Sequence, residues 1–145
     1  MRTHTLLLAA LALGFAPAPP PRSDRSEADL KNMQGAWVLV TITGEGGQTI
    51  EKAGALRLVI KGDRAKNHRG EMSSEYALTL DPSTSPKRYV FKPVGRARTE
   101  PVSRGIYSVG GGTLKFCTDG PGEAPPRAFE GPRAGTFLYV YKRPN

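Results

Sequence analysis

Short β-rich segments separated by turn residues fill the chain from residue 36 to residue 142, and this feature constrains the fold most. In ALRLVIK, residues 55–61, Leu56, Leu58 and Ile60 alternate with Arg57, Val59 and Lys61. A period of two places such side chains on one face of a strand. The 17 glycines and 13 prolines indicate many turns and few long helices, so the predicted class is all-β.

Eight strands are predicted, joined mainly by turns of hairpin length. The glycines at 110–112 lie between two of them, and glycine accepts the positive φ that tight hairpins require. We predict an eight-stranded antiparallel up-and-down barrel, because closure leaves no strand edge exposed. A two-sheet sandwich of the same strands is the alternative. The predicted strands cover residues 36–43, 48–51, 55–61, 73–80, 88–94, 105–109, 113–118 and 136–142.

The first 22 residues have the order of regions of a signal peptide. Arg2 and His4 precede an apolar run from Leu6 to Phe15, and small residues and prolines follow. The run has 10 residues, whereas a membrane-spanning helix needs about 20. We expect residues 1–22 to direct export to the periplasm or the medium and to be cleaved at a position that the pattern leaves open. No transmembrane segment is then expected.

The mature chain is expected to form one domain, since roughly 120 residues suit a single core. Residues 23–28 are polar and predict a tether, and residues 29–145 predict the barrel domain. A short helical turn just before the first strand is predicted to have an apolar face of Ala28, Leu30 and Met33.

The chain is basic, with a formal net charge of +8 that falls to +6 when residues 1–22 and their two arginines are removed. Basic residues concentrate at 61–69 and at 86–104. Neither cluster is interleaved with aromatic residues that look exposed, in the manner of single-strand binders, so we interpret both as solvated loops. An anionic surface of the cell envelope is a candidate partner, and no nucleic acid is expected.

The sequence pattern offers no catalytic or metal-binding constellation. Beyond the leader, His68 is the only histidine, and one histidine cannot supply a multi-histidine metal site. Cys117 lies between apolar neighbours in LKFCT, which predicts a buried thiol rather than a nucleophile. We therefore expect no enzyme, no metal and no cofactor.

The only tryptophan lies where a polar turn becomes an apolar run. The segment Gly35-x-Trp37 after a helical turn resembles the signature of lipocalins and related calycins. In that family the tryptophan closes the floor of the barrel, and an arginine near the end of the last strand packs across the indole. Arg143 stands in the matching place, with Lys142 as the alternative. The resemblance implies a floor of these residues, held by a cation over a ring face.

Four ordered motifs extend the resemblance over nearly all of residues 29–145: DLKNMQGAW, LDPSTSPKR, RGIYSVGGGTLKFC and RAFEGPRAGTFLYVYKR. Together they are similar to an exported lipocalin-like (calycin-type) domain family of uncharacterised planctomycete proteins. That family has an Asp-Gly-Asp-like pattern in the hairpin, whereas this chain has Gly110, Gly111 and Gly112, so any role of those acids is absent here. The resemblance implies a fold and an export route, and no ligand.

The barrel interior therefore decides the function. An eight-stranded barrel either fills with its own side chains or holds one small ligand. We expect a monomeric, non-catalytic binding module for a small apolar or amphipathic ligand. The alternative is a filled barrel acting as a structural or protein-interaction domain of the cell envelope; a calycin-type isomerase is third. Residues expected to line the cavity are Leu39, Leu56, Leu58, Ile60, Tyr76, Leu78, Leu80, Phe91, Leu114 and Phe116.

Overall fold

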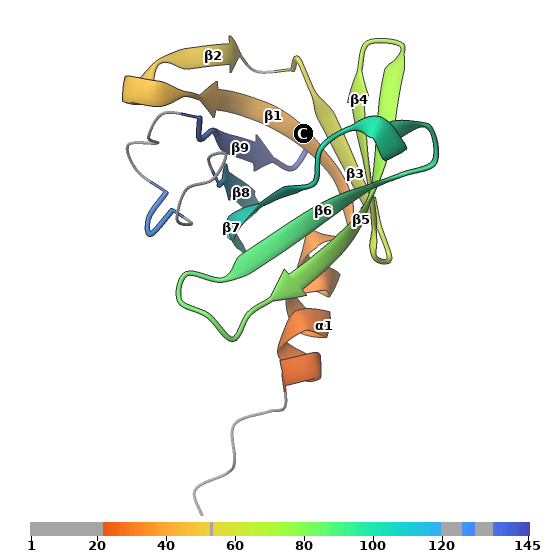
Figure 1. Ribbon diagram of the computed structural model, residues 1–145, viewed down its shortest axis with the longest axis vertical. Helices are drawn as coiled ribbons and strands as arrows, with labels where there is room; N and C mark the ends of the chain where they lie inside the picture. Colours follow the sequence, from red (N-terminus) through yellow and green to blue (C-terminus); the bar gives the residue numbers. More distant parts are fainter. Residues whose placement is uncertain (1–21, 53, 120–125, 130–134) are drawn as a thin grey trace, which may run out of the picture.

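The computed structural model describes residues 22–52, 54–119, 126–129 and 135–145. The predicted signal peptide lies outside these residues except for its last position. The described residues form one α-helix, nine strands and two short 3-10 helices (Figure 1). Their bounds are α1 (Arg22–Met33), β1 (Gly35–Thr43), η1 (Glu45–Gly47), β2 (Thr49–Lys52), β3 (Arg57–Lys61), β4 (Arg64–Arg69), β5 (Met72–Asp81), β6 (Arg88–Val94), η2 (Gly95–Thr99), β7 (Ser103–Gly110), β8 (Thr113–Thr118) and β9 (Leu138–Lys142).

Eight of these strands form a closed antiparallel up-and-down barrel. From β3 to β9 each strand pairs with the next along the chain, and β1 pairs with both β3 and β9 to complete the ring. In the closing pair, residues 38–43 of β1 lie opposite residues 138–142 of β9. The predicted barrel is confirmed, and the sandwich alternative is wrong, because one continuous sheet closes on itself.

The membership of the ring differs from the prediction at two strands. The prediction of a loop at residues 61–69 is wrong. This segment contains the end of β3, the turn at Gly62 and Asp63, and the whole of β4. The inward residues of β4 are Ala65 and Asn67, one small and one polar, so the strand has no apolar alternation to reveal it. The predicted strand at 48–51 exists as β2, which pairs with the second half of β1 outside the ring.

The helix is longer than the predicted turn. It begins at Arg22, so the residues expected to form a tether are its first turns, with Asp24 near the N-terminus and Lys31 near the C-terminus, where each charge complements the helix dipole. Met33 is fully buried in the core and Leu30 packs against it. Ala28, expected on the apolar face, is exposed.

Asp29 takes a buried position on the helix. Its Oδ2 accepts hydrogen bonds from Lys87 Nζ and from the Tyr107 hydroxyl, each at 2.7 Å. A buried carboxylate needs such partners to offset its desolvation. Burial and the neighbouring carboxylate raise the pKa of Tyr107, which keeps its hydroxyl a donor. The contact attaches α1 to the start of β6 and the middle of β7, so the helix covers one end of the barrel (Figure 1).

Trp37 and Arg143 close the same end. The Trp37 side chain is buried, and its indole N–H donates to the Met33 carbonyl at 2.8 Å. The Arg143 guanidinium lies 3.8 Å from the centroid of the indole ring. Its Nη1 donates to the Gln34 carbonyl at 2.6 Å, and its Nη2 donates to the Asn32 carbonyl at 3.0 Å. The cation therefore also binds the carbonyls at the C-terminal end of α1.

Gly35 connects helix and strand beneath this guanidinium. Its φ is +99°, a backbone conformation that other residues rarely adopt, and a Cβ there would lie 3.0 Å from Arg143 Nη1. The structure thus places Gly35, Trp37 and Arg143 together, and Gly35 leaves the room that Arg143 occupies.

Trp37→Ala should lower the free energy of unfolding by about 3–5 kcal/mol, because a large buried aromatic is removed. Arg143→Ala should cost about 1–2 kcal/mol, since the ring contact and the bonds to carbonyls are lost. A double-mutant cycle measured by denaturant unfolding should give about 1 kcal/mol of coupling. The control Lys142→Ala should change stability by no more than about 0.5 kcal/mol. Zero coupling between Trp37 and Arg143 would contradict this account of the floor.

Candidate functional site

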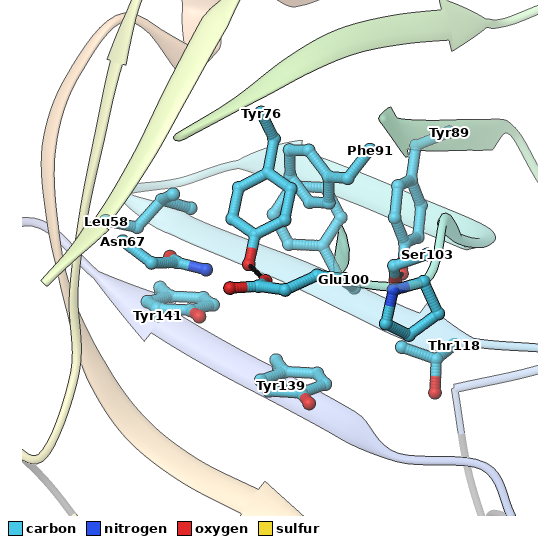
Figure 2. Close-up of a pocket in the computed structure, with 12 residues that line it drawn as sticks. Leu58, Asn67, Tyr76, Tyr89, Phe91, Glu100, Ser103, Thr118, Tyr139 and Tyr141 are labelled. Carbon is cyan, nitrogen blue, oxygen red and sulfur yellow. Dashed lines mark hydrogen bonds between the residues drawn. The ribbon is translucent and has the colours of Figure 1, made fainter. Parts of the chain in front are cut away.

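The barrel contains a cavity at the end opposite α1. Its volume is about 230 Å³. Figure 2 shows the residues that line it. Side chains come from the inner faces of β3 to β9 and from the segment that follows η2. The lining residues are Leu58, Asn67, Tyr76, Tyr89, Phe91, Glu100, Pro101, Ser103, Phe116, Thr118, Tyr139 and Tyr141.

Six aromatic rings form a continuous cluster around this cavity. Phe116 is central: its ring centroid lies 4.7 Å from that of Tyr89, 5.1 Å from that of Phe91 and 6.4 Å from that of Tyr141. Tyr76 extends the cluster through Phe91, with 5.9 Å between centroids. Tilted and edge-to-face pairs at these distances are favourable beyond the area they bury, so these contacts stabilise the aromatic wall.

Glu100 provides the charged group at the mouth. Its carboxylate accepts hydrogen bonds from the Ser74 hydroxyl at 2.9 Å and from the Tyr76 hydroxyl (Figure 2). Ser74 and Tyr76 lie on the inward face of β5, and Glu100 directly follows η2. These two hydrogen bonds therefore join β5 to the segment after η2. Burial, and then the hydrogen bond to Glu100, raise the pKa of Tyr76 to about 12.

Two further polar groups lie deeper. The Tyr89 hydroxyl is 3.4 Å from Ser103 Oγ, and burial strongly raises the pKa of Tyr89, so this phenol stays neutral. The Asn67 amide points toward the cavity (Figure 2). Its Oδ1 is buried and has no hydrogen-bond partner in the part of the chain that the structure describes. Such an orphaned acceptor is rare in a folded protein.

The predicted lining residues divide into two groups. Leu58, Tyr76, Phe91 and Phe116 line the cavity. The others belong to the hydrophobic core or pack against it and do not line the cavity: Leu39, Leu56, Ile60, Leu78, Leu80 and Leu114.

Sequence reasoning missed two thirds of the lining. Tyr89, Tyr139 and Tyr141 lie in strands that were predicted, so their alternation could have identified them. Asn67 lies in β4, which has no apolar alternation, and Glu100 lies in an irregular segment, so no periodic signal marks either residue.

Other residues considered for chemistry lie elsewhere. Cys117 is buried as the pattern predicts, and burial raises the pKa of its thiol, which disfavours the nucleophilic thiolate. His68 is in β4, opposite Arg57 and Ser73. Within residues 22–52, 54–119, 126–129 and 135–145, no three His, Cys, Asp or Glu side chains gather closely enough to bind a metal ion.

The fold defines the class as a closed eight-stranded antiparallel barrel of calycin-like form with an interior aromatic cluster. Comparison with family models, with curated proteins and with solved structures finds no match to the chain. Of the helices in the described residues, none has the length and apolar character needed to cross a membrane.

The phenol of Tyr76 should titrate near pH 12 in the folded protein. Its folded pKa exceeds the unfolded value of 10.0, so the stability it contributes is present below pH 10 and is lost as the pH rises toward 12. Glu100→Gln should lower this pKa, though not fully to 10.0, because burial remains. Tyrosinate absorbance measures the titration, with Tyr76→Phe identifying the signal. An unchanged titration in Glu100→Gln would contradict the contact.

Proposed function

We propose that the protein is an exported, non-catalytic binding module that holds one small, largely apolar molecule in the open end of its barrel. The single observation that carries this proposal is the aromatic cavity of about 230 Å³ with polar groups at its mouth. Apolar walls with a few placed polar groups are typical of ligand sites. Neutral phenols and a buried thiol supply no activated nucleophile, which favours binding over catalysis.

The volume sets the size of the ligand. It is below the roughly 300–1,000 Å³ of pockets for drug-sized molecules. It exceeds the roughly 150 Å³ of an apolar cavity that takes up benzene. A molecule with one aromatic ring or a short branched chain therefore fits, and a long lipid does not fit inside.

A second candidate function is favoured by the outer face of the β3–β4 hairpin. Arg57 lies opposite His68 and Lys61 lies opposite Arg64, and the basic side chains of Arg57, Lys61 and Arg64 are exposed. Lys61 and Arg64 are like charges directly opposite each other, and Arg64 also pairs with Asp63 at 3.8 Å. Like charges in this position destabilise a strand pair, so an anionic partner of the cell envelope would stabilise this face. In this case the barrel is a structural or protein-interaction domain, and its cavity has no ligand.

A small neutral aromatic probe tests the cavity. 5-Fluoroindole, followed by fluorine NMR, should bind the purified protein saturably with one site per chain. Ser103→Phe places a ring in the cavity and should weaken binding about tenfold or more, because the space is filled. The matched control is Ser73→Phe at an exposed position of β5 outside the cavity, which should bind as the unchanged protein does.

Two results would reject the binding module. One is the absence of saturable binding to a protein whose near-ultraviolet spectrum shows a folded core. The other is equal binding by Ser103→Phe and the unchanged protein, which would place the probe elsewhere. Either result would favour the second candidate function.

Export is proposed from the leader alone, whose apolar run and following small residues have the order of a signal peptide. Residues 1–25 fused to a reporter that is active only outside the cytoplasm should confer activity. A fusion in which Leu7, Leu8 and Leu11 are replaced by arginine should confer none, because charged residues abolish the apolar run. An intact fusion that is retained inside the cell with an inactive reporter would refute export.

A further inference from the structure

The charge of the cavity opposes the charge of the protein. The chain has 21 Lys and Arg against 13 Asp and Glu. Yet none of the described residues that line the cavity is Lys, Arg or His, and Glu100 is the only charged residue among them. A basic protein that keeps cations out of its cavity and places a carboxylate at the mouth discriminates against anionic ligands and favours cationic ones.

The aromatic walls favour a cation as well. Ring faces carry a partial negative charge, and a cation over a face is attracted most strongly where water is excluded. The Tyr139 and Tyr141 rings are nearly parallel, at 7°, with 6.5 Å between their centroids. In the view of Figure 2, the Glu100 carboxylate extends between these two rings and the ring of Tyr76. A positive group bound near Glu100 would thus also meet aromatic surfaces.

The charged group of the cavity is a hydrogen-bond acceptor with positions to spare. A carboxylate has about four acceptor positions, and the Glu100 carboxylate uses two of them for Ser74 and Tyr76. The phenol of Tyr76 keeps its proton at neutral pH, so it remains a donor to Glu100. The two acceptor positions that remain on the Glu100 carboxylate suit a ligand that brings N–H donors.

We infer that the cavity binds a small organic ammonium ion with one aromatic ring, its ammonium group bound by Glu100 and its ring among the aromatic walls. This inference rests on the proposed binding function and names the class of its ligand. In this ligand the chain between the ring and the nitrogen is short, because a cavity of about 230 Å³ has room for little beyond the ring.

Three probes of the same shape and different charge test this inference: 2-phenylethylammonium, 2-phenylethanol and phenylacetate. By isothermal titration calorimetry on the full protein, the ammonium ion should bind about tenfold or more tightly than the alcohol, and phenylacetate should bind more weakly than the alcohol. Glu100→Gln should reduce the preference for the ammonium ion to about twofold or less. The control Glu75→Gln removes an exposed carboxylate of β5 outside the cavity lining and should keep the full preference.

The outcomes separate the inference from the proposed function. Equal or tighter binding of the alcohol or of phenylacetate would overturn the ammonium ligand, and the binding module would stand. If none of the three probes binds while 5-fluoroindole binds saturably, the ammonium ligand would likewise be overturned and the binding module would stand. Failure of 5-fluoroindole as well would reject the binding module itself. An equal loss of preference in Glu100→Gln and Glu75→Gln would show a general charge effect and would overturn the role of Glu100.

Discussion

The packing of the Arg143 guanidinium on the Trp37 indole is the constraint on which the rest of the barrel depends. Trp37 lies at the start of the first strand and Arg143 lies just after the last, so their contact joins the two ends of the ring. The same guanidinium binds carbonyls at the end of α1, which places the helix over the floor. At this place a cation, a ring face and helix carbonyls complement one another, beside the β1–β9 strand pairing that closes the ring.

Because side chains fill the end of the barrel next to α1, the cavity lies at the opposite end. Met33, Trp37, Leu39 and other large side chains fill the interior next to α1. Towards the opposite end the inward positions include Asn67 and Ser103, which are too small to fill the space between the rings. An eight-stranded ring leaves just enough room for side chains, so a few small residues are sufficient to open a void.

Close backbone packing keeps this space defined. A Cβ at Gly105 in β7 would lie 1.9 Å from the carbonyl oxygen of Cys117 in β8, so a residue with a side chain does not fit there. The Arg88 side chain in β6 donates to Asp119, just beyond β8, at 2.9 Å. This contact joins the two strands that flank β7. The wall beside the cavity is therefore held by close backbone contact and an ion pair.

The sequence by itself determined the class of fold, because strands with alternating apolar residues and hairpin turns between them are local features. It also indicated Trp37 as a special position and Cys117 as a buried thiol. Only the tertiary structure decided that residues 64–69 are a strand of the ring, since the inward Ala65 and Asn67 carry no apolar signal and the strand is stabilised by its neighbours' hydrogen bonds. The cavity was likewise decided by tertiary structure. Glu100 and Tyr76 are 24 positions apart and meet only when β5 and the segment after η2 come together. A sequence pattern reports which face a side chain occupies, whereas a void depends on how side chains from many strands fill one shared volume.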